Sequence, residues 1–507
     1  MDRPGWRERS VRQLTALDAQ FLHAESPTTT AHVAGVAIVD PGDAAAGRIT
    51  KGTLVALLRR RAHLAPALRL RLAGVPFGLD LPYWAEDPGF DPADHVYETT
   101  LPAPELLTDV VARLHERRLS RHRPLWEMHL IHGLEHGRVA IYTKVHHCAI
   151  DGVSGAETLA ALLDLAPGGP EPACAPPPAD PVTAPGTLGM LAGAAVNSMT
   201  HPLRALGSLR RTAADLDAVP IAATLPGARW VARAARLLGG EAGRAPALPS
   251  LEVPRTPLTG PVSGQRRFAY GSLPLADIRR VGRAFGMSVN DVVMAMCAAA
   301  LRAWLAERDV LPDRPLIAAV PVAARARTDG RGPGAVGNRI SAMAAPIATH
   351  LADPLERLLS TREAMRAAKR RFASSPATWL SDLSALLPPP VTALATASVF
   401  RLAGLACPPV NLIVSNVPGP RVPLYLCGGK VVAYYPMSVV TDLSGGLSVT
   451  CFSYDGSLDF GLLACPRHVD DVWRLLGHLR AALDELSALA GPAPEPAAET
   501  AKETVPA

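Results

Sequence analysis

The spacing of apolar residues predicts an α/β fold that begins with an N-terminal domain. Alternating small and β-branched residues predict a buried strand at 32–40, and two further strand patterns at 128–134 and 138–144 flank a short turn, as in a hairpin. Apolar residues at helical spacing predict helices at 53–72, 105–120 and 154–165. We assign residues 1–165 to this domain.

The same alternation of strands and helices returns in a second domain, which we assign to residues 256–490. Ser288 is expected to cap a helix that runs to Glu307, and residues 469–488 have the pattern of a strongly amphipathic helix. Strand patterns occur in this half at 268–273, 315–322, 412–417, 430–436, 447–454 and 457–464.

A linker and a basic crossover, together residues 166–255, separate the two domains. Residues 167–185 contain eight prolines, which favours an extended linker. The arginine-rich stretch at 190–238 is expected to form helical pieces that are broken at its prolines, namely Pro202, Pro220 and Pro226. Residues 491–507 read as a disordered tail. A substrate cleft is therefore expected between the two domains.

Composition fits a large globular protein. The chain has 507 residues, of which 48% are hydrophobic and 19% charged. The longest uncharged apolar stretch, 383–400, is interrupted by three prolines, so no transmembrane helix is expected. The charged N-terminus lacks the apolar segment of a signal peptide, and the seven scattered cysteines form no C-x-x-C pair. These features favour reduced thiols and a cytoplasmic location.

The formal net charge of +5 is concentrated in the crossover, where residues 190–245 contain seven arginines against three acidic residues. Two interpretations remain open for this segment. Its basic face could meet an anionic membrane surface, or it could be an ordinary solvated helix face. No nucleic-acid-binding motif accompanies the arginines, so nucleic acid is not expected as a partner.

The strongest chemical signal is a histidine pair that directly follows the strand pattern at 138–144. His146 and His147 are followed by Asp151 and Gly152. A histidine at a strand end can be held by main-chain hydrogen bonds and can accept a proton near neutral pH. Asp151 can hold the turn together or orient an imidazole, and Gly152 lets the main chain or a ligand approach closely. A solvated histidine pair beside a turn is the alternative interpretation.

Other catalytic patterns do not fit the chain. The segment from His132 to His136 matches H-x-x-E-H, but that zinc pattern needs a helix, whereas Gly133 and Gly137 indicate a turn. No metal site is therefore expected. No G-x-S-x-G nucleophile elbow, Walker A or G-x-G-x-x-G motif occurs, and the glycine-rich residues 330–337 read as a loop.

The sequence HHCAIDG at 146–152 resembles the HHxxxDG motif of CoA-dependent acyltransferases, the superfamily of chloramphenicol acetyltransferase and of peptide-synthetase condensation domains. Further segments narrow the resemblance to the bacterial wax ester synthase/diacylglycerol acyltransferases: the N-terminal block at 14–35, Pro124-Leu125-Trp126, Asn290-Asp291, Gly337-Asn338, Asn416 to Pro420, and 454–461. The resemblance implies a mixed α/β (α+β) fold of two chloramphenicol-acetyltransferase-like domains, with mixed sheets flanked by helices and the active site at their interface.

The resemblance also implies roles for individual residues. His147 would be the general base, which takes the proton of an acceptor hydroxyl as its oxygen attacks the thioester of an acyl-CoA. His146 would support it, and Asp151 would be mainly structural. Candidates for substrate or oxyanion contacts are Gly152, Asn290, Asp291, Trp126 and Asn416, although Asn290 could instead cap a helix and Trp126 could pack the fold. Acyl-CoA is a co-substrate, and neither a cofactor nor a metal is implied.

The expected function is transfer of a long-chain acyl group from acyl-CoA to diacylglycerol or to a long-chain alcohol. The expected location is the cytoplasm, the inner membrane face or lipid inclusions. One alternative is a non-catalytic paralogue that binds lipid droplets or membranes, against which the intact His147, Asp151 and Gly152 speak. Another is an amide-forming condensation enzyme, which would normally adjoin a carrier domain. Ala323 stands where the family often has a serine after Pro-Val, which puts the substrate preference in doubt.

Overall fold

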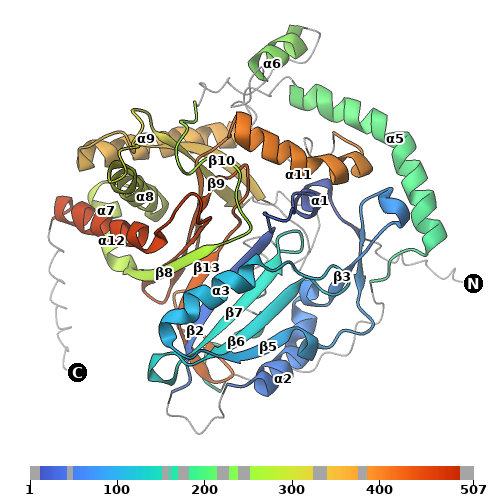
Figure 1. Ribbon diagram of the computed structural model, residues 1–507, viewed down its shortest axis with the longest axis horizontal. Coiled ribbons are helices and arrows are strands. Elements are labelled where there is room, and N and C mark those ends of the chain that lie inside the picture. The colour runs from blue at the N-terminus through green and yellow to red at the C-terminus, as the bar shows by residue number, and fades with distance from the viewer. Residues whose placement is uncertain are drawn as a thin grey trace, which may run out of the picture.

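The computed structural model describes residues 12–42, 49–150, 158, 161–168, 182–213, 228–237, 252–323, 340–374, 384 and 386–491. Within these ranges the chain forms two six-stranded sheets and a small three-stranded sheet, with helices against the larger sheets (Figure 1). The predicted mixed α/β class is confirmed. Of the predicted helix at 154–165 the structure describes residues 158 and 161–165, and 158, 161 and 162 are helical. Of the predicted linker at 167–185 it describes 167–168 and 182–185, and the tail at 491–507 lies outside the described residues after Gly491.

The first sheet contains the strand that leads to the histidine pair. Its order is β12 (Tyr425–Leu426), β13 (Gly429–Met437), β2 (His32–Asp40), β7 (Val139–His146), β6 (Trp126–His132) and β5 (Val96–Thr100). β5 and β6 are parallel, whereas the other neighbours are antiparallel. The predicted hairpin of β6 and β7 is confirmed, and His136 in its turn has a positive φ of 57°.

Two strands of this first sheet come from the C-terminal part of the chain. β13 pairs with β2 along nearly its whole length, so residues 425–437, which lie inside the expected range 256–490, complete the N-terminal sheet. The contact is close: a Cβ on Gly35 would lie 2.1 Å from the hydroxyl of Tyr434. The two sheets are therefore interlocked by β12 and β13, and are not divided strictly along the sequence.

The second sheet has the order β10 (Ile340–Ile347), β9 (Leu316–Ala323), β11 (Leu412–Val417), β14 (Leu447–Tyr454), β15 (Ser457–Ala464) and β8 (Arg267–Pro274). The strand predictions in this half that fall on β8, β9, β11, β14 and β15 are confirmed. A large apolar core lies between this sheet and four helices: α7 (Leu275–Ala284), α8 (Val289–Ala306), α9 (Pro354–Ser374) and α12 (Val472–Leu489).

α8 is long and apolar enough to cross a membrane, and it is the one such helix among the described residues. However, 67% of its apolar stretch is buried against the second sheet and the neighbouring helices. Its N-terminus is the predicted one: Ser288 caps it and Asp291 closes a capping box. α8 is therefore a core helix of the C-terminal half.

The N-terminal half carries α1 (Ala16–His23), α2 (Lys51–Arg61) and α3 (Leu107–Glu116), and a small sheet of order β1 (Arg12–Gln13), β4 (Tyr83–Glu86) and β3 (Leu70–Ala73). The helix predicted at 53–72 is only partly correct. It ends at Arg61, and residues 70–73 are a strand. A single 3₁₀ turn follows at Ala62–Leu64, and the helical stretch stops at Ala65 because Pro66 disfavours helical geometry in the residue before it.

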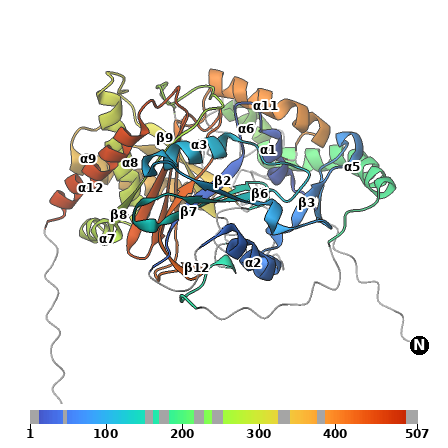
Figure 2. The same cartoon turned by 60° about the horizontal axis from the view of Figure 1, so that its bottom comes forward.

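α5 (Thr187–Ala213), α6 (Ala228–Leu237) and α11 (Pro389–Ala406) lie along one side of the molecule, near α1 (Figures 1 and 2). The predicted break at Pro202 is wrong, since α5 continues through it and bends along its length (Figure 1). Pro220 and Pro226 lie outside the described residues. The prolines at 388–390 begin α11, where a missing N–H costs nothing in the first turn.

A shared apolar core joins the two halves. It combines Val36 and Val111 of the N-terminal half with Phe268 and Leu463 of the second sheet. Arg266 lies nearby, 5% exposed, and donates to the main-chain oxygens of Thr28 (2.9 Å) and Val440 (3.4 Å). The loop before β2 is thereby tied to the C-terminal half.

Candidate active site

His147 is the first residue after β7, and its main chain is fixed where the strand ends. Its N–H donates to the carbonyl of Ala31 at 2.8 Å, and the N–H of His146 donates to the carbonyl of Leu125 at 2.9 Å. These bonds continue the ladders to β2 and to β6, so the imidazole starts from a rigid position. Only 7% of His147 is exposed.

The ring of His147 lies against the ring of Phe21 on α1. The two ring centroids are 4.1 Å apart and the planes differ by 3°. α1 is itself held in place, because Thr15 caps it by accepting from the N–H of Asp18 at 3.1 Å. Phe21 therefore covers one face of the candidate base.

The C-terminal half reaches the same helix. α11 packs against α1, and the hydroxyl of Thr396 donates to the side-chain oxygen of Gln20 at 3.2 Å. Because Phe21 follows Gln20 directly, His147 lies where the N-terminal domain meets the C-terminal half. The prediction that the active site lies at this interface depends on the role of His147 and stays a prediction.

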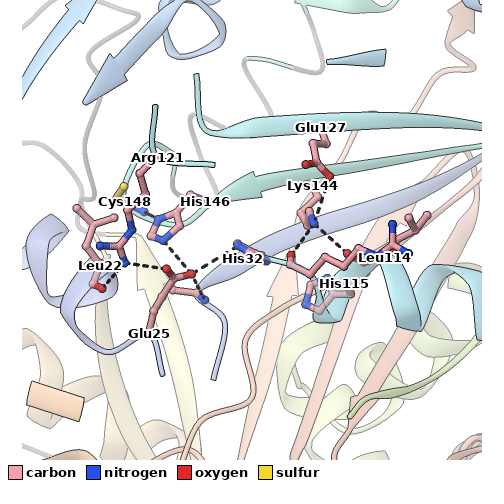
Figure 3. Close-up of polar contacts among 12 residues, drawn as sticks. Leu22, Glu25, His32, Leu114, His115, Arg121, Glu127, Lys144, His146 and Cys148 are labelled. Atoms are coloured by element: carbon pink, nitrogen blue, oxygen red, sulfur yellow. Dashed lines mark hydrogen bonds and ion pairs between the residues drawn. The ribbon is translucent and has the colours of Figure 1, made fainter. Parts of the chain in front are cut away.

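The ring of His146 has a defined tautomer. The N–H of Cys148 donates to its Nδ1 at 3.1 Å, so Nδ1 carries a lone pair and the ring proton of the neutral imidazole is on Nε2. Nε2 lies 3.4 Å from Oε1 of Glu25, as Figure 3 shows. His146 is thus turned toward a buried carboxylate, and its side chain is 1% exposed.

Glu25 is the centre of this buried network. Its Oε2 accepts from Arg121 at 2.8 Å, and its Oε1 accepts from the N–H of Ala31 at 3.4 Å and lies 3.6 Å from Nε2 of His32 (Figure 3). Burial acts to raise the pKa of Glu25, but the contact with His146 and the bond from Arg121 outweigh it and leave the pKa well below its ordinary value. Glu25 is therefore an anion.

Further titratable groups are buried beside it. Burial, with the charge of Lys144, lowers the pKa of both His32 and His115, so these rings are neutral. Lys144 donates to the carbonyls of Leu114 (2.9 Å) and Arg117 at the end of α3, a favourable place for a cation. Lys144 thereby ties β7 to the end of α3, beside the network of Glu25 and His146 (Figure 3).

The carboxylate of Asp291 is bonded at the N-terminus of α8, and its predicted contact with substrate stays a prediction. Its carboxylate accepts from the N–H and the hydroxyl of Ser288, at 3.1 and 2.7 Å, and from Lys369 of α9 at 2.8 Å. Burial acts to raise its pKa, but Lys369 and Ser288 hold the pKa below its usual value. Asn290 is the second residue of α8 and is partly buried. Its assignment to the oxyanion stays a prediction.

Trp126 and Asn416 also lie in packed surroundings. The indole of Trp126 is 1% exposed, donates to the carbonyl of Leu68 at 2.9 Å and stacks on His95 at 4.5 Å. Asn416, in β11, accepts from the thiol of Cys451 at 3.4 Å. Trp126 thus packs the fold, as one of its two interpretations expected, and neither residue has a described contact with His147.

Asp151 and Gly152 lie outside the described residues, so their predicted roles are not tested. In the part of the chain that the structure describes, no group of three or more histidine, cysteine or acidic side chains has an arrangement that could hold a metal ion. The six cysteines described there are not joined in disulfides.

The sequence did not assign roles to Phe21, Glu25 or His32. All three lie in the block at 14–35, which was matched to a family as a whole, and nothing in its spacing singles them out. Their partners, His146 and His147, lie more than 100 residues later in the chain. Only the pairing of β2 with β7 brings the two segments together.

Comparison with known proteins gives one consistent family. Residues 14–293 match the wax ester synthase/diacylglycerol acyltransferase catalytic domain, and residues 336–487 match the C-terminal domain of the same proteins. A Mycobacterium tuberculosis protein with the provisional name diacylglycerol O-acyltransferase is 38% identical over 485 residues, which cover 94% of this chain and all of that protein.

Solved structures agree in fold. The wax ester synthase/diacylglycerol acyltransferase from Marinobacter aquaeolei VT8 is 30% identical, with a TM-score of 0.66 over 95% of this chain and all of that one. The first condensation domain of the calcium-dependent antibiotic synthetase is 17% identical, with a TM-score of 0.51 over 95% of this chain and 97% of that one. At this identity the second match shows the fold alone.

Proposed function

The chain belongs to the wax ester synthase/diacylglycerol acyltransferase family, and on that premise we propose that it transfers a long-chain acyl group from acyl-CoA to the hydroxyl of diacylglycerol or of a long-chain alcohol. The observation that carries this proposal is the position of His147. Its main chain is fixed at a strand end, its ring is stacked on Phe21, and it lies where the two halves meet.

In the proposed reaction His147 takes the proton from the acceptor hydroxyl while the oxygen attacks the thioester carbonyl. A tetrahedral oxyanion forms, the carbon–sulfur bond breaks, and the proton on His147 passes to the CoA thiolate. The products are an ester and CoA, so protons balance without any exchange with solvent. The reaction needs no covalent acyl-enzyme, no metal and no bound cofactor, and Asn290 remains a candidate donor to the oxyanion.

We also propose that the protein works at a lipid surface. α5 turns Met190 and Ala194 toward Tyr83 and Val75 of the N-terminal half. Its opposite face carries an exposed apolar stripe, the α5 stripe, which consists of Leu188, Val196, Met199, Leu203 and Leu206. An exposed apolar row on a helix whose other face is already packed favours contact with lipid over a solvated helix face.

α11 also has one buried face and one exposed apolar face. Thr392 and Thr396 face inward, and the outward face carries the α11 stripe: Val391, Leu394, Val399, Leu402 and Leu405. Leu394 is 85% exposed and Leu188 in the α5 stripe is 83% exposed. Both helices lie along the side of the molecule where α1 carries Phe21 (Figures 1 and 2). This arrangement supports a peripheral location on a membrane or lipid inclusion, where both proposed acceptors dissolve.

The proposal is tested by CoA release from purified protein with acyl-CoA and one acceptor at a time: diacylglycerol, a long-chain alcohol or a long-chain amine. Release with either hydroxyl acceptor supports the proposal. Release with the amine alone would identify an amide-forming enzyme. Vesicle binding without CoA release from any acceptor would identify a non-catalytic lipid-binding protein.

A further inference from the structure

We propose that Glu25 is a positioning residue for His147, acting through the ring of His146 and through the peptide group of Ala31. The inference rests on the proposed function, because it assumes that His147 is the base. Figure 3 shows Glu25 on the loop after α1, directed at the end of β7.

The first connection runs through His146. The bond from the N–H of Cys148 leaves the ring proton on Nε2, and the carboxylate oxygen Oε1 of Glu25 lies 3.4 Å from Nε2, a charge contact without hydrogen-bond geometry. A buried carboxylate this close attracts the N–H edge of an imidazole, and so favours the Nε2–H tautomer and one orientation of the ring. Since Cys148 is the residue after His147, a fixed ring of His146 also fixes the main chain on the far side of His147.

The second connection runs through Ala31. Its N–H donates to Oε1 of Glu25 at 3.4 Å, and its carbonyl accepts from the N–H of His147 at 2.8 Å. A single residue, Ala31, therefore links the carboxylate of Glu25 to the main chain of His147 through two hydrogen bonds. One connection holds the N–H of His147 and the other holds the N–H of the next residue, Cys148. The main chain on both sides of the His147 side chain is therefore fixed, which restricts where its imidazole can lie.

The negative charge of Glu25 is balanced at this buried position by an arginine. The side chain is 3% exposed, and a buried carboxylate is costly unless it is paired. Arg121 supplies the pairing charge from the partly exposed side, and it also donates to the carbonyl of Leu22 at the end of α1 at 2.8 Å. The groups that face Glu25 are Arg121, His32 and His146, of which only the first is a permanent cation.

The test compares the kinetics of Glu25→Gln with those of the unchanged protein. Glutamine keeps the shape but replaces the anion by a weak neutral acceptor. Because a misplacement of about 1 Å can cost up to about 100-fold in rate, we expect kcat to fall by about 10–100-fold. KM for acyl-CoA should stay within about twofold, because a positioning effect acts on the chemical step. Glu25→Asp, which keeps the charge, should recover part of kcat.

Glu98→Gln is the matched control. Glu98 also pairs with a histidine, His132, at 2.7 Å, but at the hairpin end of β6, away from the end of β7. It should leave kcat unchanged. An unchanged kcat in Glu25→Gln, or a loss equal to that of the control, would overturn the proposal. If Glu25→Gln does not fold, Arg121→Leu replaces it, with a smaller fall in kcat expected and an unchanged kcat contradicting the proposal.

A second readout does not depend on activity. In protein labelled with ¹⁵N-histidine, the signal of His146, identified by its loss in His146→Asn, should be that of the Nε2–H tautomer, and it should change in Glu25→Gln. If the unchanged protein releases no CoA, the proposed function fails, whereas the structural link is still decided by this signal. A His146 signal that is the same in both proteins would overturn the link itself.

Discussion

Phe21 lies flat against the imidazole of His147, with 4.1 Å between ring centroids and 3° between planes. An imidazole can rotate about its side-chain bonds, and a catalytic base must keep its nitrogen directed at the acceptor hydroxyl. A parallel aromatic ring restricts that rotation without using a hydrogen bond. α1, which carries Phe21, is therefore part of the support for the candidate base.

Phe21→Ala should lower kcat by about 10-fold, because the ring of His147 becomes free to leave its reactive orientation. Phe21→Tyr keeps the stacked ring and should retain most of the activity. CoA release checks both. Phe90→Ala is the control, since Phe90 lies against His95 and Trp126 instead. Equal losses in Phe21→Ala and Phe90→Ala would indicate a general packing effect and contradict the assignment.

The sequence predicted the parts of the fold in which local signals agree with the tertiary structure. β2, β11, β14 and β15 were found with their bounds, because each has an uninterrupted apolar pattern. α11 was missed, since the prolines at its start read as breakers when no neighbour is known. The crossing of β13 into the first sheet was missed because strand order is not encoded in local spacing.

The site was predicted in the same uneven way. The strand pattern pointed to the histidine pair, and the family resemblance then selected His147 as the base, a role that stays a prediction. The carboxylate of Asp291 is bound to Ser288 and Lys369, and its proposed contact with substrate stays a prediction. Glu25 could not be found, because a lone glutamate in a loop carries no signal until β2 and β7 pair.

The buried carboxyl of Asp459 should make the free energy of unfolding fall as the pH rises. It is 0% exposed, its Oδ1 has no hydrogen-bond partner, and burial raises its pKa to about 6. The folded protein therefore binds a proton that the unfolded chain, with a carboxyl pKa of about 3.9, has already released. The contribution of protonated Asp459 to the free energy of unfolding is fully present below about pH 3.9. It is lost as the pH rises through about 6, which lowers the free energy of unfolding by up to about 3 kcal/mol.

Asp459→Asn removes this titration and should raise the melting temperature at pH 8 while leaving it nearly unchanged at pH 4. Thermal unfolding at both pH values checks it. The control is Asp484→Asn, an exposed carboxylate on α12, which should change neither value. A variant with the same pH dependence as the unchanged protein would show that Asp459 is ionised at little cost.

The α5 and α11 stripes should bind lipid through apolar contact. Met199→Glu with Leu203→Glu, or Leu394→Glu with Leu402→Glu, should weaken flotation with vesicles of neutral lipid by about 10-fold or more, because each change places a charge where a methyl-rich side chain entered the lipid. Leu489→Glu, at the end of α12 on the opposite side of the molecule (Figure 1), is the control.

Arg233 separates the two possible sources of binding. It is exposed on α6, so Arg233→Gln should weaken binding to anionic vesicles and leave binding to neutral vesicles unchanged.

Unchanged flotation of both stripe variants would return α5 and α11 to the role of ordinary solvated helices.

The role of His147 is tested by CoA release from His147→Ala with acyl-CoA and either diacylglycerol or a long-chain alcohol. General-base catalysis contributes about 10²–10⁴-fold, so we expect a loss of at least about 100-fold with an unchanged melting temperature. His122→Ala, an exposed histidine, should keep full activity. Near-native CoA release by a folded His147→Ala protein would contradict the assignment of His147 as the base.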